Sequence, residues 1–291
     1  MPQLEPRRYT KDLSEPVQKL ERTEPEPPKP KQVTAVIVSH NRQACLRRCL
    51  ESLERADARE TFDIIVVDNG SSDGSAGLDD EFPAARFIRL PKNFGLTKAL
   101  NIGIRAADTE FVLLLHEDTE VEPPAVGLLA ATLESAPEAA AVCPLLVAGA
   151  GAPAPQLGIL PPDDCYRPAS PGEAPAAVEY PRGAAVLFRS FFLRAMRQID
   201  ERYGQFGSDA DLAQQVRRGA KKILLVPAAR VLHHGREETS SLRKADFRLG
   251  RAVWTGKYHG FLAGIGARLA AIFSPQIRYT SGGQKIDGTQ Q

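Results

Sequence analysis

The sequence predicts an α/β fold in which helices flank a mostly parallel central sheet. Three observations indicate this. Short apolar runs rich in β-branched residues recur along the chain, and segments with helical periodicity separate them. The runs are apolar at consecutive positions, as expected for strands buried on both faces of a sheet. Helices of roughly 10–15 residues between such strands are typical of parallel sheets with helices on both faces.

The amino-terminal half alternates regularly between the two kinds of element. A strand over 33–38 precedes a helix over 42–55, in which Leu46, Leu50 and Leu53 lie on one side. Apolar residues at this spacing form the buried face of a helix. Further strands are expected at 62–67, 86–90, 110–115 and 139–143, and further helices at 96–107 and 124–135.

The regular pattern is interrupted over residues 148–181, which are rich in Ala, Pro and Gly. A loop this long inside a compact domain is usually functional or mobile, so we expect it to border a binding site. Regular structure then returns, with strands at 184–188, 223–226 and 230–233 and helices at 209–218 and 242–273.

The last helical segment contains an unusually apolar portion, residues 261–273. We interpret it first as a helix packed on the domain. A helix lying on a membrane surface is the alternative, because Lys257, Arg268 and Arg278 flank or interrupt the apolar residues.

The two ends of the chain differ in composition from the part between them. Residues 1–32 mix Pro, Glu, Lys and Arg and offer little apolar surface to offset the entropy of ordering. We therefore divide the chain into a disordered or loosely attached segment (1–32), a main domain (33–240), a helical segment (241–275) and a flexible tail (276–291). No signal peptide and no run of about 20 apolar residues is visible, which predicts a cytoplasmic location.

The overall composition narrows the functional classes. Apolar residues make up 43% and charged residues 25%, as in an ordinary globular protein. The net charge of +1 argues against a nucleic-acid-binding protein. Four cysteines are too few for a disulfide scaffold in 291 residues. Cys45 and Cys49 share a helix face, and we interpret them as buried thiols because no second Cys or His pair has metal-site spacing.

The most informative polar cluster is His116-Glu117-Asp118, directly after the strand over 110–115. Open α/β sheets bind ligands at the carboxyl ends of their strands. Further acids and histidines come downstream: Asp209, Asp211, His233 and His234. Together these residue types can hold a divalent metal on a diphosphate while another carboxylate removes a proton.

Polar residues at other strand ends are candidates for binding a nucleotide. Asp68 ends the second strand, where its carboxylate can accept a hydrogen bond from a base or ribose, and Gly70 can adopt a positive φ. The other candidates are Ser39, Asn41, Asn93, Lys98 and Asn101. A polar loop and a capped amphipathic helix would give a similar pattern at these five positions. No Gly-x-Gly-x-x-Gly follows either strand, so a dinucleotide fingerprint is absent.

The succession of these motifs resembles family 2 glycosyltransferases. In the first half the matching segments are Val-Ile-Val-Ser-His-Asn-Arg (36–42), Val-Val-Asp-Asn-Gly-Ser-Ser-Asp-Gly (66–74), the asparagine- and glycine-containing segment 93–103 and Leu-His-Glu-Asp-Thr-Glu-Val (115–121). In the second half they are segments 183–189, 206–212 and 226–234. The resemblance covers about residues 33–260 and is greatest to the branch with rhamnosyl- and galactofuranosyltransferase-like enzymes.

The resemblance implies a GT-A fold and inverting transfer from a nucleoside diphosphate sugar with Mn²⁺ or Mg²⁺. It implies that Asp68 contacts the base and that His116 or Glu117 lies on the ribose side. Asp118 matches the last acid of the Asp-x-Asp motif, which binds the metal, and His233 matches a late histidine that completes the metal site in some members. Asp209 matches the catalytic base, with Asp211 beside it.

Two positions depart from the family pattern. His116 stands where members commonly carry Asp or Asn, and imidazole suits Mn²⁺ less well than carboxylate does, which leaves the metal open. Ser208 replaces the Glu that usually precedes the base. These departures keep a non-catalytic nucleotide-sugar-binding relative as an alternative. A sugar nucleotidyltransferase is disfavoured, because no Gly-rich basic loop follows the first strand.

The sequence thus predicts a glycosyltransferase that acts on a glycan or lipid-linked acceptor in cell-surface polysaccharide synthesis. The irregular residues 148–181 are expected on the acceptor side. The inner face of the cytoplasmic membrane is the expected location if the C-terminal segment contacts lipid. The sugar, the nucleotide base and the oligomeric state stay open.

Overall fold

The computed structural model describes residues 31–273 except 58, 164, 171, 205 and 236–240. The predictions for residues 1–30 and 274–291, which include nearly all of the two terminal segments, lie outside the described residues.

Four parallel strands form one half of a nine-stranded sheet, in the order β3-β2-β1-β4. They are β1 (Val33–Ser39), β2 (Phe62–Asp68), β3 (Ala85–Arg89) and β4 (Phe111–His116). Their register places Ser39 beside Asp68 and Val38 beside His116. The polar residues that end these strands therefore meet at one end of the sheet.

The other half of the sheet continues from β4 through β11 (Ala185–Arg189), β6 (Ala139–Val147), β12 (Lys222–His233) and β5 (Thr119–Val121). β11 is antiparallel to both β4 and β6, so β6 runs in the direction of β4, and β12 is parallel to β6. The prediction of a mostly parallel sheet is confirmed, with β5, β9 and β11 as its antiparallel strands.

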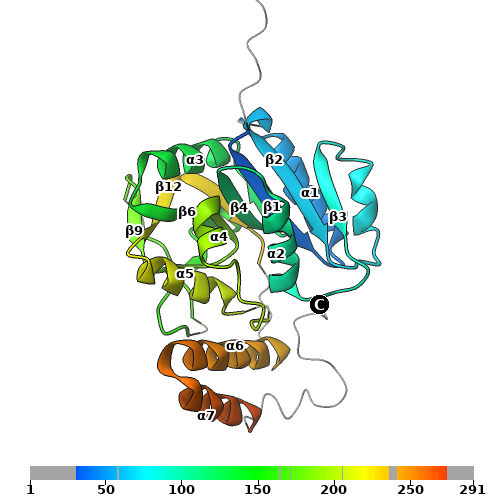
Figure 1. Ribbon diagram of the computed structural model, residues 1–291. Helices are drawn as coiled ribbons and strands as arrows, with labels where there is room; N and C mark the ends of the chain where they lie inside the picture. The colour runs from blue at the N-terminus through cyan, green and yellow to red at the C-terminus, as the bar shows by residue number, and fades with distance from the viewer. Residues whose placement is uncertain are drawn as a thin grey trace, which may run out of the picture.

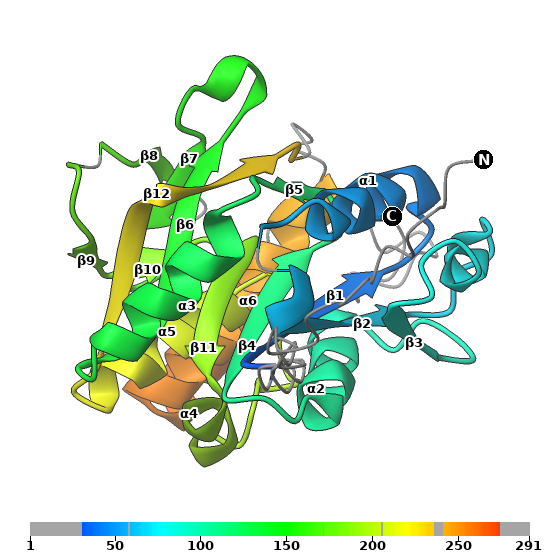
Figure 2. The ribbon, with the colours of Figure 1, turned by 90° about the horizontal axis from the view of Figure 1, so that it is seen from above.

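Helices cover both faces of the sheet (Figures 1 and 2). One face carries α1 (Gln43–Glu54) and α3 (Ala125–Ser135), and the other carries α2 (Leu96–Ala106), α4 (Ser190–Ala195) and α5 (Ser208–Arg218). Successive strand residues enter opposite cores, since Ile37 packs with α1 while Val36 and Val38 pack with α2. Leu46 and Leu50 of α1 are fully buried, and burial of each contributes roughly 1.5–3 kcal/mol.

Residues 148–181 contain more regular structure than their composition predicts. The segment has short strands β7 (Pro155–Gly158), β8 (Arg167–Pro168), β9 (Ala176–Val178) and β10 (Tyr180–Pro181). β7, β8 and β10 form a second sheet, and β9 adds to the edge of β12. Strands of two to four residues are too short to show a side-chain periodicity in the sequence.

One prediction of element boundaries is wrong. The strands expected at 223–226 and 230–233 are one strand, β12, whose register with β6 is irregular between Val226 and Arg230. Pro227 lies in this stretch and has no N–H to donate to the ladder. Three short 3₁₀ turns, at Arg59–Thr61, Ser75–Asp79 and Gly149–Gly151, complete the described elements of the sheet domain.

The C-terminal segment is helical, as predicted, and consists of two helices. α6 (Ser241–His259) and α7 (Phe261–Ile272) meet at Gly260, whose φ of 101° is the left-handed backbone that favours glycine. Figure 1 shows the pair at the bottom of the molecule, below α5. The two helices are so close together that a Cβ at Gly264 would lie 2.5 Å from the Cα of Gly256. Among the described helices, none has both the length and the apolar character required to cross a bilayer.

Candidate active site

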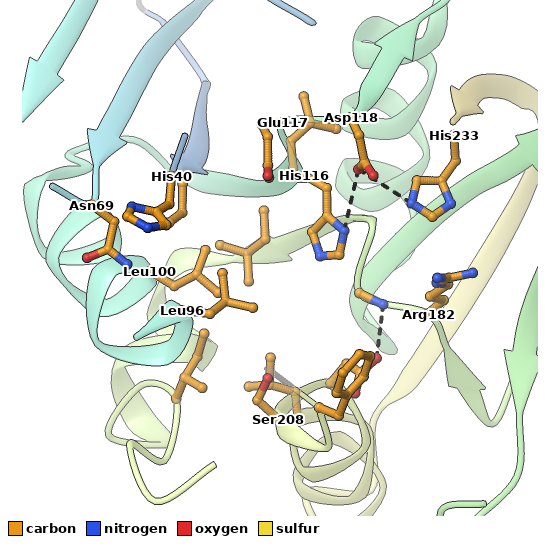
Figure 3. A pocket seen from close by; sticks show the side chains of 18 of the residues that line it. His40, Asn69, Leu96, Leu100, His116, Glu117, Asp118, Arg182, Ser208 and His233 are labelled. Atoms are coloured by element: carbon orange, nitrogen blue, oxygen red, sulfur yellow. Dashed lines mark hydrogen bonds and ion pairs between the residues drawn. The ribbon is translucent and has the colours of Figure 1, made fainter. Parts of the chain in front are cut away.

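A cavity of about 180 Å³ opens where β1, β4 and β12 end and α5 begins (Figure 3). Its polar wall includes His116, Glu117, Asp118, Asp209 and His233, all of which the sequence singles out. Its apolar wall includes Leu96 and Leu100 of α2. The fold thus brings together side chains that are separated by more than a hundred residues along the chain.

Asp118 and two histidines form a compact cluster at one side of this cavity. One nitrogen from each of His116 and His233 and an oxygen of Asp118 all lie within 4.8 Å of one another. The Asp118 Oδ1 atom is 3.5 Å from His233 Nε2 and 3.9 Å from His116 Nδ1 (Figure 3). The pairing of His233 with Thr119 between β12 and β5 holds the two segments together. The His234 amide also donates to the Asp118 carbonyl at 3.0 Å.

The surroundings lower the pKa of both His116 and Asp118, which favours a neutral imidazole and an ionised carboxylate. Burial lowers the pKa of the His116 imidazole to about 4, and the negative charge of Asp118 acts in the opposite direction. Burial works to raise the pKa of the Asp118 carboxyl. The hydrogen bond with His233 and the charges of His116, His233 and Arg42 outweigh it and hold this pKa well below its ordinary value. A neutral His116 and an ionised Asp118 can both donate lone pairs to a cation at neutral pH.

The donor set fits a divalent transition metal. The carboxylate oxygen suits Mn²⁺, whereas the two imidazole nitrogens suit softer ions such as Zn²⁺ better. His116 is thus a member of the cluster, where the sequence comparison places a carboxylate. His116, which the sequence assigns to the nucleotide, lies in this cluster and also lines the cavity.

Arg42 is a cavity residue that the sequence analysis did not select. Its Nη1 lies 3.3 Å from Glu117 Oε1 and 3.2 Å from Asp118 Oδ2. Burial raises the pKa of Glu117, and the neighbouring Asp118 raises it further, while Arg42 opposes both effects. Arg42 therefore offsets part of the negative charge that two adjacent acids create. Its place directly after the polar Ser39-His40-Asn41 was the available sequence signal.

Two buried polar atoms lie beside the cavity on the side of β1 and β2. Ser39 and Asp68 are adjacent through the register of these strands, and both side chains are buried. Within the described residues, Ser39 Oγ and Asp68 Oδ1 have no hydrogen-bond partner, whereas Asp68 Oδ2 accepts from the Ser71 amide at 3.3 Å. A buried polar group without a partner is costly, so these atoms are suited to binding a ligand.

Asn93 also lines the cavity, but Asn41 and Gly70 shape the loops around it. Asn41 Oδ1 accepts from the Ser72 amide at 2.7 Å. Gly70 has a φ of 75°, and a Cβ there would lie 2.5 Å from the backbone of Lys92. Asn41 and Gly70 therefore fix the loops that follow β1 and β2.

Lys98 and Asn101, which the sequence predicts as nucleotide ligands, do not line the cavity. Lys98 is exposed and stacks on the Phe94 ring, 4.9 Å from its centroid. Asn101 is buried and exchanges hydrogen bonds with the backbone of Ile199, at 2.8 and 2.9 Å. Its side chain connects α2 to the segment before α5.

Asp209 lies at the start of α5 and faces the cavity. Its Oδ1 accepts from Tyr180 Oη at 2.9 Å and from the Ala210 amide at 2.9 Å. Its Oδ2 accepts from Tyr166 Oη at 3.0 Å and from the Gly183 amide at 3.2 Å. The carboxylate thus has neutral hydrogen-bond donors and no cationic partner within 4 Å among the described residues.

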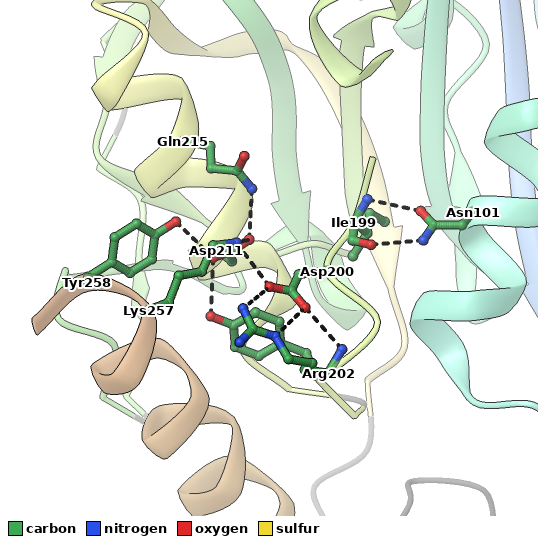
Figure 4. A network of polar contacts seen from close by, with 9 residues as sticks. Asn101, Ile199, Asp200, Arg202, Asp211, Gln215, Lys257 and Tyr258 are labelled. Atoms are coloured by element: carbon green, nitrogen blue, oxygen red, sulfur yellow. Dashed lines mark hydrogen bonds and ion pairs between the residues drawn. The ribbon is translucent and has the colours of Figure 1, made fainter. Parts of the chain in front are cut away.

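Asp211, which the resemblance places beside the catalytic base, does not line the cavity. Its carboxylate is fully buried and binds Lys257 Nζ at 2.8 Å and Tyr258 Oη at 2.8 Å, both from α6 (Figure 4). Tyr203 and Gln215 also donate to it. Asp211 therefore anchors the C-terminal helices to α5.

Two further cavity residues, Tyr166 and Arg182, come from irregular parts of the chain and are not among the predicted site residues. The Arg182 guanidinium lies over the Tyr166 ring, 5.3 Å from its centroid. Neither residue belongs to a motif. Tyr166 lies within residues 148–181, which were expected to border the site, and Arg182 directly follows them.

A match to a known protein family decides which family the chain belongs to. The sequence model of the family described as Glycosyl transferase family 2 matches residues 34–192, more than half of the chain. The chain belongs to this family. The resemblance predicted from the motifs is thereby confirmed.

Two relatives illustrate the range of this family. The chain is 26% identical over 245 residues to the N-acetylglucosaminyl-diphospho-decaprenol L-rhamnosyltransferase of Mycobacterium tuberculosis, covering 71% of this chain and 79% of that protein. It is 32% identical over 112 residues to an N-acetylglucosaminyltransferase of Sinorhizobium fredii, covering 36% of this chain and 27% of that protein. The chain thus spans about a quarter of the length of the second relative.

Solved structures share the fold at low sequence identity. Staphylococcus aureus TarS in complex with UDP-GlcNAc has a TM-score of 0.59 at 16% identity, covering 87% of this chain and 76% of that chain. GalNAc-T7 with UDP, GalNAc and Mn²⁺ has a TM-score of 0.63 at 18% identity, covering 72% of this chain and 45% of that chain. These likenesses confirm the GT-A fold expected for family 2 glycosyltransferases.

Proposed function

We propose that this family 2 glycosyltransferase moves a sugar from a nucleoside diphosphate sugar to a hydroxyl of a glycan or lipid-linked acceptor, with inversion at the anomeric carbon. The observation that carries the proposal is the pairing of two chemical groups in one cavity. The His116–Asp118–His233 cluster stands at the ends of β4 and β12, and Asp209 stands at the start of α5. A metal-binding cluster serves the departing diphosphate, and a carboxylate serves the attacking hydroxyl.

The residues around the cavity have distinct roles in this reaction. Ser39 and Asp68 hold the nucleoside through their buried oxygens, and Asn93 and Glu117 face the rest of the donor. Asp118 and His233, with His116, would hold Mn²⁺ or Mg²⁺, which offsets the charge of the leaving diphosphate when bound. Arg42 keeps Glu117 and Asp118 from repelling the donor phosphates.

Asp209 is the general base of the proposed reaction. It takes the proton from the acceptor hydroxyl while that oxygen bonds to the anomeric carbon. The bond between the anomeric carbon and the diphosphate oxygen breaks on the opposite face, which gives inversion. General-base assistance of this kind contributes roughly 10²–10⁴-fold to the rate. The hydrogen bond from Tyr166 to Asp209 supports placing residues 148–181 on the acceptor side.

The acceptor class is supported by the relatives. The Mycobacterium tuberculosis protein named above carries a lipid diphosphate in the name of its acceptor, and another relative is a teichoic acid poly(glycerol phosphate) polymerase of Staphylococcus epidermidis. An acceptor of cell-surface polysaccharide synthesis that is built on a lipid would be reached from the inner face of the cytoplasmic membrane.

Helix α7 supports contact with such a membrane. It packs on α6 through small residues, among which Gly264 and Ala271 are buried. Its large apolar side chains are exposed instead: Phe261 (78%), Leu262 (81%), Ile265 (39%), Leu269 (50%) and Ile272 (51%). From Phe247 to Phe273 the sequence has five basic or histidine residues and no acid. An exposed apolar helix with basic neighbours fits the interface of an anionic bilayer.

We expect vesicle binding to depend on this apolar face. Changing Phe261, Leu262 and Leu269 together to serine should weaken binding to vesicles of phosphatidylcholine and phosphatidylglycerol by at least roughly 10³-fold, since each of the three apolar side chains contributes about 1.5–3 kcal/mol when buried and every 1.4 kcal/mol is about tenfold in affinity. Co-sedimentation measures the effect. Phe191→Ser removes a side chain that is 60% exposed on α4 and serves as the control. Equal binding by the triple variant and the wild type would contradict the membrane contact, as would a dimer that only the wild type forms in ultracentrifugation.

Donor hydrolysis tests the proposed function most directly. We expect release of one nucleoside diphosphate from a panel of UDP-, GDP- and dTDP-sugars in the presence of Mn²⁺ or Mg²⁺, and its loss when EDTA is added. Calorimetry on the same panel separates the alternatives. Nucleotide binding without turnover, even with candidate acceptors present, would indicate a non-catalytic relative, and no binding at all would contradict the transferase.

A further inference from the structure

The cavity contains an arginine whose charge is not matched by an acid. Arg182 lies between Pro181, which ends β10, and Gly183, whose amide binds Asp209. Of the carboxylates that the structure describes, none approaches its guanidinium within 4 Å, whereas Arg42, the other arginine of the cavity, has two acidic partners. A cation in a partly enclosed cavity without a counter-charge favours binding an anion.

The surroundings hold Arg182 in place while leaving its guanidinium edge open. The Arg182 amide donates to the Gln156 carbonyl at 2.7 Å, and the fully buried Gln156 side chain bonds to the backbone of β6 at Leu146 and Pro144. The guanidinium lies over the Tyr166 ring. Stacking uses one face of the planar group, so the N–H donors at its edge can bind an oxyanion in a bidentate manner.

The position of Arg182 relates it to the metal cluster. Figure 3 shows its guanidinium on the side of the cavity where His116 and His233 lie. Arg182, His116 and His233 all line the same cavity. A diphosphate bound at the cluster would therefore lie within the field of Arg182 as well.

We propose that Arg182 binds the terminal phosphate of the donor's nucleoside diphosphate, as a second cationic contact beside the metal cluster. This inference rests on the proposed function. The arginine would orient the donor and offset the negative charge that grows on the terminal phosphate oxygen as the sugar bond breaks. An acceptor carrying a phosphate offers the same chemistry, and its binding there is a separate outcome of the test.

Calorimetry with matched nucleotides tests the assignment. UDP and UMP, GDP and GMP, and dTDP and dTMP are titrated into the wild type, Arg182→Gln and Arg182→Lys, with Mn²⁺ and with EDTA. For the nucleoside that binds the wild type, we expect Arg182→Gln to weaken the diphosphate by about 10- to 100-fold and the monophosphate by less than about 2-fold. Arg182→Lys should lie between, because it keeps the charge without the planar fork.

Arg86→Gln on the exposed face of β3 is the control, since it removes the same charge far from the cavity. Unchanged diphosphate affinity in Arg182→Gln would overturn the assignment, and so would an equal loss for both nucleotides. A raised KM for a phosphate-bearing acceptor with unchanged nucleotide affinities would transfer the role to the acceptor side. If the wild type binds none of the nucleotides, the proposed function fails, and the role of Arg182 fails with it.

Discussion

Replacing Asp118 with asparagine is expected to abolish metal-dependent transfer. The Asp118 carboxylate lies between the two imidazoles of the cluster, 3.5 Å from one and 3.9 Å from the other, and provides its only negative charge. Asparagine has nearly the same shape but is neutral. A Lewis acid that polarises a phosphoryl oxygen is worth several kcal/mol, so we expect kcat/KM to fall by roughly 10³-fold.

A control acid close by in the chain separates this effect from a general loss of charge. Glu120 lies on β5 and pairs with His234 and Arg48 without lining the cavity. Glu120→Gln should keep near-normal kcat/KM. Binding of Mn²⁺, followed by calorimetry, provides a second readout. If Asp118→Asn still binds Mn²⁺ and remains sensitive to EDTA, the metal lies elsewhere.

The layout of the fold could be predicted because each strand of the first half ends in a polar residue after an apolar run. Ser39, Asp68 and His116 are examples. Parallel strands in register bring such ends together at one edge of the sheet, so the position of the cavity could be predicted from the amino-acid sequence. The position of His233 does not follow from this pattern. His233 lies on β12, in the other half of the sheet, and the antiparallel pairing of β12 with β5 places it next to Asp118.

The family resemblance predicts Asp211 beside the catalytic base Asp209, although helix geometry argues against a shared role. Residues two positions apart on a helix point in very different directions. Asp209 faces the cavity, and Asp211 faces α6, where Lys257 neutralises it. The sequence could have excluded a shared role, but it could not have named Lys257 and Tyr258 as partners 46 and 47 residues away.

Tyr166 and Arg182 show a different limit of sequence analysis. Their positions depend on β7, β8 and β10, strands too short to leave an alternating pattern. Asn101 is comparable, since its partner Ile199 lies 98 residues away in an irregular segment. Residues placed by such long-range contacts could be found only once the tertiary structure was available.

Replacing Asp209 with asparagine should remove most of the transferase activity while leaving the fold intact. The amide cannot accept the proton of the acceptor hydroxyl, so we expect kcat to fall by roughly 10²–10⁴-fold. The carbonyl of asparagine can still accept hydrogen bonds from one tyrosine and one backbone amide, and the other tyrosine hydroxyl can turn to accept one from the new amide. The second backbone amide, that of Gly183 or Ala210, cannot turn and loses its acceptor, so we expect a loss of about 1 kcal/mol in the free energy of unfolding. Nucleotide affinity should stay close to that of the wild type.

Asp211→Asn is the matched comparison on the same helix, and it should have the reverse effect. It weakens a buried ion pair with Lys257 and the hydrogen bonds from α6, so we expect a loss of about 2–4 kcal/mol in the free energy of unfolding. Its kcat, measured on folded protein, should remain within a few-fold of the wild type, because Asp211 does not reach the cavity. Urea denaturation and initial-rate kinetics on both variants distinguish the two roles. Near-normal transfer by Asp209→Asn would show that another group takes the proton, and a large loss of kcat in a stable Asp211→Asn would return Asp211 to the catalytic machinery.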